Sequence, residues 1–183
     1  MGRRDGRRER PPLNAEKLNK LALAYVGRFA TTRSKLASYL GRKLRERGWS
    51  GERSPDVDAL TERFASLGYV DDAAYALSKS RSLTGRGYGF RRVRQALRAA
   101  GIEEEDAEPA NALAESEAAE AALKFARRRR LGPFGSCEEP SREQREKGIA
   151  AMVRAGHSFD LSRTIVNLEP GCHFDIEMLE KKA

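Results

Sequence analysis

Residues 67–101 of the chain are LGYVDDAAYALSKSRSLTGRGYGFRRVRQALRAAG, and this stretch decides the fold. It predicts two helices joined by a basic turn that carries a glycine at every second position, 85–89. Asp71 predicts the start of the first helix, because an aspartate side chain can cap free backbone N–H groups. In the second helix, Val93 and Leu97 form the buried stripe and Gly101 marks its end. The stretch therefore predicts a rigid helical corner with arginines on its surface.

Helical spacing of apolar residues continues outward from this corner in both directions, and almost no strand-like alternation is present. The sequence therefore predicts an all-α fold of about nine helices. The residues expected to cap these helices are Asn14, Thr31 or Thr32, Ser54 before Pro55, Asp71, Ser141 in a capping box with Gln144, and Ser158. Pro109 predicts that the sixth helix is short, kinked or late-starting, because proline cannot donate a backbone hydrogen bond.

A weak internal repeat suggests how the helices are grouped. The pattern Leu40-x3-Leu44-x3-Gly48 recurs over 93–101 and, in degraded form, over 148–156, where Gly148 replaces an apolar residue and leaves the packing of the third copy open. Each copy is expected to be the middle helix of a three-helix group, so the chain is predicted to form tandem three-helix repeats in an elongated, bent rod. The expected divisions are a disordered basic arm at 1–13, modules at 14–69, 70–114 and 115–168, and a C-terminal tail at 169–183.

Composition limits the classes of function. The net charge of +8 favours a partner with a negative surface, such as nucleic acid or a nucleoprotein complex. Cys137 and Cys172 belong to no metal-binding or redox motif, so neither a disulfide framework nor a metal site is expected. No long apolar run or secretory signal is found, which predicts a protein of the cytoplasm without a membrane span. No nucleophile, base or metal cluster predicts an enzyme, and no cofactor is expected.

Arginines near the glycine turn are the candidate binding residues. Arg91, Arg94 and Arg98 share one helical face because they are three and seven positions apart. The full set for a partner or DNA is Arg81, Arg86, Arg91, Arg92, Arg94, Arg98, Arg127 and Arg128. Gly85, Gly87 and Gly89 are expected to allow close approach of a partner's backbone. A merely solvated charged face is the alternative, whereas a nucleotide loop is disfavoured because a helix, not a strand, precedes the turn.

The central motif resembles a known family. LGYVDD at 67–72, GRGYGFRRVRQAL at 85–97 and Gly101-Ile102 are similar to the signature of the RecX regulatory proteins, bacterial modulators of the RecA recombinase. The resemblance extends over roughly residues 18–168 and implies tandem three-helix repeats. It also implies a regulator that lies in the groove of the RecA nucleoprotein filament. A monomer is expected, and direct contact to single- or double-stranded DNA is a further expectation.

Two other functions remain open. The protein could be a stand-alone DNA-binding protein of the helix-turn-helix type, with Arg91, Arg92, Arg94 and Gln95 as base-contacting candidates. The other predicted modules lack equivalents of these residues. The third hypothesis is a helical scaffold for an unrelated partner.

Overall fold

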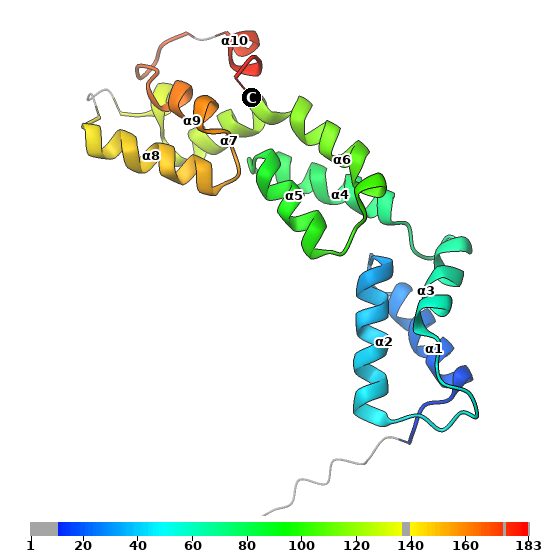
Figure 1. Cartoon of the computed structure of the whole chain (residues 1–183). Coiled ribbons are helices and arrows are strands. Elements are labelled where there is room, and N and C mark those ends of the chain that lie inside the picture. Colours follow the sequence, from blue (N-terminus) through cyan, green and yellow to red (C-terminus); the bar gives the residue numbers. More distant parts are fainter. Residues whose placement is uncertain (1–10, 137–139, 174, 183) are drawn as a thin grey trace, which may run out of the picture. The chain divides into compact units, whose positions relative to one another are not determined.

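The structure is a computed structural model that describes residues 11–136, 140–173 and 175–182. These residues form ten α-helices and one short 3₁₀ helix and contain no strand, so the predicted all-α fold is confirmed. The chain divides into two compact units, residues 1–72 and 73–183. The helices, labelled in Figure 1, are α1 (Ala15–Val26), α2 (Arg33–Arg47), α3 (Val57–Ser66), α4 (Asp72–Gly85), α5 (Phe90–Ala99), α6 (Glu104–Ser116), α7 (Ala118–Arg129), η1 (Gly132–Phe134), α8 (Arg142–Arg154), α9 (Phe159–Val166) and α10 (Ile176–Glu180).

The first unit is a bundle of three helices in which α2 packs against both α1 and α3. Leu18, Leu36, Leu40 and Phe64 are buried between them. The predicted caps are confirmed where Asn14 accepts a hydrogen bond from the Lys17 amide and Thr32 accepts one from the Lys35 amide.

Residues 11–13 do not belong to the expected basic arm, which is a correction to its boundary. Leu13 is fully buried, its amide donates to the Gly48 carbonyl and its carbonyl accepts from the Ser50 amide. The unpaired backbone at the end of α2 supplies partners for Leu13, which is why an apolar residue beside two prolines is held in the core. The rest of the arm, residues 1–10, lies outside the described residues.

The predicted N-cap of the third helix was wrong by two residues. Ser54 precedes the helix, but the capping side chain is that of Asp56, which accepts a hydrogen bond from the Ala59 amide at 2.8 Å. Pro55 therefore lies outside the helix rather than at its first position. Serine and aspartate are similarly good caps, and Asp56 is the one directly before Val57, the first residue of the apolar stripe.

In the second unit, α4, α5 and α6 share an apolar cluster. Val93 and Leu97 on α5 are buried as predicted, and the Ser80 hydroxyl on α4 donates to the Ala110 carbonyl on α6. The expectation of a short or late-starting α6 was wrong, because α6 starts at Glu104 and runs for 13 residues with Pro109 inside it, whereas the kink at Pro109 stays a prediction. Its alanines 107, 110 and 114 are buried in the cluster shared with α4 and α5, and this burial favours the helix, whereas Pro109 removes one of its hydrogen bonds.

Helices α7, α8 and α9 share another cluster in the same unit, in which Phe125, Met152 and Ile165 are buried. The predicted capping box is confirmed, because the Ser141 hydroxyl accepts from the Gln144 amide and the Gln144 side chain accepts from the Ser141 amide. Gly148 is buried, and a Cβ there would lie 3.2 Å from Leu131 Cδ2. The unexpected glycine of the third repeat thus leaves room for Leu131.

The segment expected to be a C-terminal tail is part of this packing. Helix α10 contacts α7 and α9, and Leu179 is fully buried in the cluster of Phe125 and Ile165. It is the tenth helix, one more than the sequence predicted. An apolar stripe of five residues is too short to be distinguished from a turn by its periodicity alone.

Each of the three middle helices of the predicted repeat is followed by a glycine with a positive φ angle, which is the C-cap of α2 and comes one residue after the C-cap of α5 and α8. Gly48, Gly101 and Gly156 follow α2, α5 and α8 with φ angles of 74°, 69° and 102°, in the left-handed region where glycine is favoured. The buried apolar residues form three clusters, although the compact units are two. The rod shape and the separation of 70–114 from 115–168 stay predictions.

Candidate partner-binding groove

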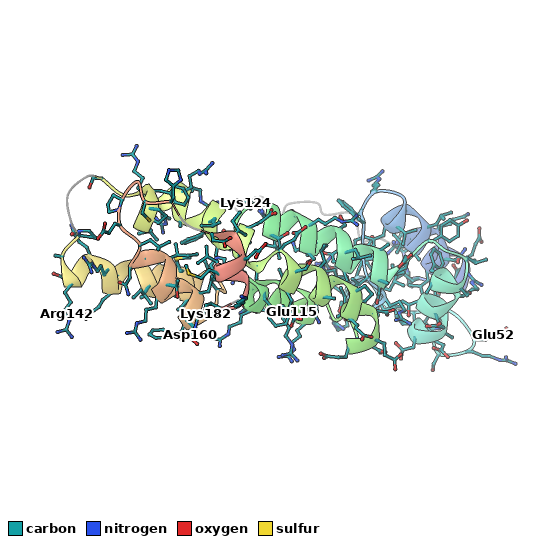
Figure 2. The ribbon with its side chains drawn as sticks, turned by 90° about the horizontal axis from the view of Figure 1, so that it is seen from above. Glu52, Glu115, Lys124, Arg142, Asp160 and Lys182 are labelled. Atoms are coloured by element: carbon teal, nitrogen blue, oxygen red, sulfur yellow. The ribbon has the colours of Figure 1, made fainter. Side chains whose placement is uncertain are left out.

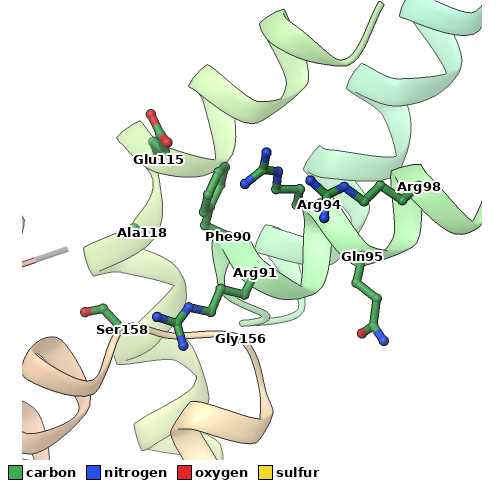
Figure 3. A pocket seen from close by; sticks show the side chains of 9 residues that line it. All are labelled: Phe90, Arg91, Arg94, Gln95, Arg98, Glu115, Ala118, Gly156 and Ser158. Atoms are coloured by element: carbon green, nitrogen blue, oxygen red, sulfur yellow. The ribbon is translucent and has the colours of Figure 1, made fainter. Parts of the chain in front are cut away.

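Helix α5 forms one wall of a groove of about 820 Å³ within the second unit. The groove is shown in Figure 3 and is lined by Phe90, Arg91, Arg94, Gln95, Arg98, Glu115, Ala118, Gly156 and Ser158. Arg91, Arg94 and Arg98 therefore lie on one face, as their spacing predicts. Three guanidinium groups beside an aromatic ring, a side-chain amide and a hydroxyl form a surface suited to an anionic partner.

The N-terminus of α5 is held in place by the chain's own backbone. The Gly89 amide donates to the Ala155 carbonyl at 3.0 Å, and the Arg91 amide donates to the Gly156 carbonyl at 3.1 Å. These bonds satisfy N–H groups that a helix start otherwise leaves free. With Val93 and Leu97 buried on the opposite side, the arginine face of α5 is fixed toward the groove.

The glycine turn serves intramolecular packing, which corrects the expected role of two of its three glycines. A Cβ at Gly87 would lie 2.8 Å from the Phe125 nitrogen, and a Cβ at Gly89 would lie 2.5 Å from the Gly156 carbonyl carbon. Both glycines are buried, so the backbone that approaches them closely belongs to α7 and the 155–157 turn rather than to a partner. Gly85 is exposed and has open space around its Cα.

The other predicted arginines lie outside the groove. Arg92 donates to the Gln95 side chain at 2.9 Å, and Arg81 is exposed on α4. At the end of α7, Arg128 donates to the Arg86 carbonyl at 2.5 Å, and the Arg127 guanidinium lies 4.9 Å from the centroid of the Phe134 ring. The structure thus brings three of the eight arginines together in the groove. Charged side chains elsewhere, such as those of Lys124 and Arg142, project from the outer faces of helices (Figure 2).

Two carboxylates that the sequence did not indicate belong to this region. Glu104, the first residue of α6, pairs with Arg94 at 3.3 Å between Oε1 and Nη2. Glu115, near the end of the same helix, lines the groove itself. Neither was predicted, because only the packing of α6 beside α5 brings its glutamates near the arginines, and no motif in the sequence marks that contact.

His157 is a further residue whose role the sequence did not show. Its side chain is buried, its Nε2 lies 3.1 Å from the Gly87 carbonyl oxygen, and its ring meets the Phe125 ring edge-on. Because a carbonyl oxygen only accepts, Nε2 carries the proton of a neutral imidazole. Burial lowers the pKa of His157 to about 4, although the hydrogen bond to Gly87 acts in the opposite direction. His157 thus holds the glycine turn in position behind the groove.

Known proteins share both the sequence and the fold of this chain. The family model of the second three-helix domain of RecX matches residues 71–110, which include all of α5. The regulatory protein RecX of Myxococcus xanthus is 33% identical over 178 residues, covering 91% of this chain and 95% of its own length. The chain belongs to the RecX family. The regulatory protein RecX of Agrobacterium fabrum is 32% identical, covering 74% of this chain and 73% of its own length.

Two solved structures of RecX proteins have a similar fold. The crystal structure of RecX from Lactobacillus salivarius aligns with a TM-score of 0.62 and 22% identity, covering 82% of this chain and 93% of that one. A crystal structure of a regulatory protein RecX aligns with a TM-score of 0.57 and 26% identity, covering 79% of this chain and 67% of that one. The all-α RecX fold is therefore shared by this chain. Among the described helices, none is both long and apolar enough to cross a membrane.

Proposed function

We propose that this protein binds the nucleoprotein filament of the RecA recombinase and limits its recombinase, ATPase and coprotease activities. It would thereby regulate DNA recombination, repair and the SOS response. The observation that carries the proposal is the 33% identity to a regulatory protein RecX over nearly the full length of both chains. The role is regulatory rather than enzymatic, in line with the names of the relatives.

The groove of α5 supports this proposal by its chemistry. A filament of protein and DNA offers repeated carboxylates and phosphates, and arginine guanidinium groups bind both in a forked geometry. A surface in which Arg91, Arg94 and Arg98 point the same way can engage such a partner with several contacts at once. Contacts that repeat along a polymer raise the overall affinity well above that of a single contact.

A stand-alone DNA-binding protein of the helix-turn-helix type is less well supported. A recognition helix places its N-terminal residues in the major groove of DNA. In α5 the side chains of Arg91 and Arg92 are exposed, but the backbone amides of Gly89 and Arg91 already donate to the carbonyls of Ala155 and Gly156, so they are not free to bind a DNA phosphate. Figure 3 shows Gly156 and Ser158 beside Arg91.

Strand exchange by RecA on single-stranded DNA tests the proposal directly. Purified protein, added at a sub-stoichiometric ratio to RecA, should lower both strand exchange and DNA-dependent ATP hydrolysis. Binding to naked DNA, measured in parallel, separates the two functions. If both RecA activities are unchanged at saturating protein while the filament forms normally, the proposal is wrong, and tight DNA binding in that case would favour the alternative.

A further inference from the structure

We infer that the groove along α5 is a binding site for an acidic peptide segment that carries an apolar side chain, and that Glu104 engages one of its arginines, Arg94, in the free protein. The inference deepens the proposed function, because it names the kind of contact that a protein partner would make in the groove. A phosphate backbone of DNA is the competing occupant and is addressed by the test.

The cationic side of the groove sets the charge of its occupant. Arg91, Arg94 and Arg98 lie on successive turns of α5, so their Cα atoms extend over about 10 Å of helix length. Figure 3 shows these three side chains on the same side of the helix. A segment with two or three carboxylates can pair with them, since arginine binds carboxylates through two parallel N–H groups.

The chain's own carboxylate shows which chemistry this wall accepts. Arg94 already pairs with Glu104, and both side chains remain substantially exposed, at 43% and 73%. An exposed pair of this kind contributes little, about 0.2–1 kcal/mol. A partner's carboxylate can therefore displace Glu104 from Arg94 at small cost.

The remaining lining distinguishes a peptide from a nucleic acid strand. Glu115 lines the same groove and repels a backbone that carries a charge on every nucleotide, whereas a peptide can place a neutral residue there. Phe90 packs against the cluster of α4–α6, so only part of its ring is available, which suits an apolar side chain better than base stacking. Gln95 and Ser158 add polar groups for a peptide backbone.

The probe is a fluorescein-labelled peptide of sequence GDELDFEG, titrated with the full-length protein. Its neutral analogue GNQLNFQG and the analogue GDEGDGEG, which lacks apolar side chains, test the two parts of the inference. We expect either analogue to bind at least about tenfold more weakly, because each close charge-assisted contact or buried apolar group accounts for roughly that factor. Equal binding of all three peptides would overturn the inference.

Variants of the protein identify the site. Replacing Arg91 and Arg98 with glutamine should weaken binding of the acidic peptide at least about tenfold. Glu104→Gln should strengthen binding of the acidic peptide about two- to fivefold, because Arg94 is released from its internal partner. The matched control is Glu108→Gln, which removes an exposed carboxylate from the same helix outside the groove and should change nothing. A peptide affinity that is unchanged in Glu104→Gln, or that rises equally in Glu108→Gln, would contradict the assignment.

Oligothymidylate is the probe for the competing occupant. The inference fails if the acidic peptide does not bind, while oligothymidylate binds the unmodified protein and binds the Arg91 and Arg98 variant much more weakly. The groove is then a phosphate site. Filament binding is measured separately with RecA on single-stranded DNA. Filament binding without peptide binding refutes only this inference, whereas peptide binding without any effect on RecA refutes the proposed function.

Discussion

At the scale of single residues, Gly87 is the most constrained position behind the groove. Its φ angle is 80°, and a Cβ would lie 2.8 Å from the Phe125 nitrogen. Backbone atoms of α7 cannot move aside in the way a flexible side chain can. Gly85, two positions earlier in the same turn, has neither constraint.

We therefore expect Gly87→Ala to lower the free energy of unfolding of the second unit by about 1–3 kcal/mol, from strain in the left-handed region and from the clash. Gly85→Ala is the matched control and should be neutral or stabilising by about 0.4–1 kcal/mol. Urea unfolding followed by circular dichroism measures the free energy of unfolding of both variants. Trp49, which lies in the first unit, provides a fluorescence signal that neither substitution should alter. Equal stability of the two variants would mean that α7 does not restrict Gly87.

His157 makes the stability of this region dependent on pH. Its pKa is about 4 in the folded chain against 6.5 for an ordinary histidine, so the unfolded chain takes up the proton first as the pH falls. Stability is fully present above pH 6.5 and is lost between pH 6.5 and about 4. The total loss is on the order of 3 kcal/mol, at about 1.4 kcal/mol for each pKa unit.

The measurement is the free energy of unfolding at neutral pH and at about pH 5, where most carboxylates are still ionised. His157→Gln should remove this part of the pH dependence, whatever its effect on stability at neutral pH. His173→Gln changes an exposed histidine and should keep the slope of the unmodified protein. If His157→Gln unfolds with the same pH profile as the unmodified protein, the buried imidazole does not control this transition.

At the scale of helices, the start of α3 has two candidate N-caps, Ser54 and Asp56, and the structure shows that Asp56 is the cap. Asp56→Ala should destabilise the first unit by about 0.5–2 kcal/mol, because the Ala59 amide loses its side-chain acceptor. Ser54→Ala should have no comparable effect, because Ser54 makes no cap to α3. Trp49 fluorescence during urea unfolding reports on this unit. A larger loss from Ser54→Ala would show that the helix begins earlier in solution.

Helix ends that depend on residues nearby in the sequence could be predicted, whereas helices that depend on packing against other helices could not. Asn14, Thr32, Ser141 and Ser158 cap their helices as predicted, because an N-cap depends on amides only a few residues away. Helices α6 and α10 were misjudged. The alanines of α6 are buried against α4 and α5, and Leu179 of α10 is buried against α7 and α9, and such packing between helices outweighs local preference.

At the scale of the whole molecule, the effect of charge can be separated from the effect of geometry. Replacing Arg91, Arg94 and Arg98 together with glutamate should reduce binding to the RecA filament by several orders of magnitude, since each close contact to a charged group contributes roughly 1.5–3 kcal/mol. The fold should be retained, because the buried stripe of α5 is Val93 and Leu97. Binding by the unmodified protein should also weaken with salt.

The matched control replaces Arg28, Arg45 and Arg154 with glutamate, which makes the same change in net charge at three exposed positions outside the groove. It should retain most of the affinity. Co-sedimentation measures the binding of both variants to RecA filaments, and circular dichroism verifies their helix content. Similar losses from the two triple variants would mean that net charge alone determines binding, and the role proposed for the groove would be wrong.

By itself, the sequence determined the all-α class, most helix starts, the glycine helix ends and the shared face of Arg91, Arg94 and Arg98. Each follows from interactions within a few turns of one helix. Only the tertiary structure decided that Gly87 and Gly89 pack against the chain's own backbone, and that Glu104 reaches Arg94. It also decided that His157 is buried against the glycine turn, 70 positions away. These contacts join residues on different elements, from 10 to 70 positions apart, so their energies have no local signature in the residues that make them.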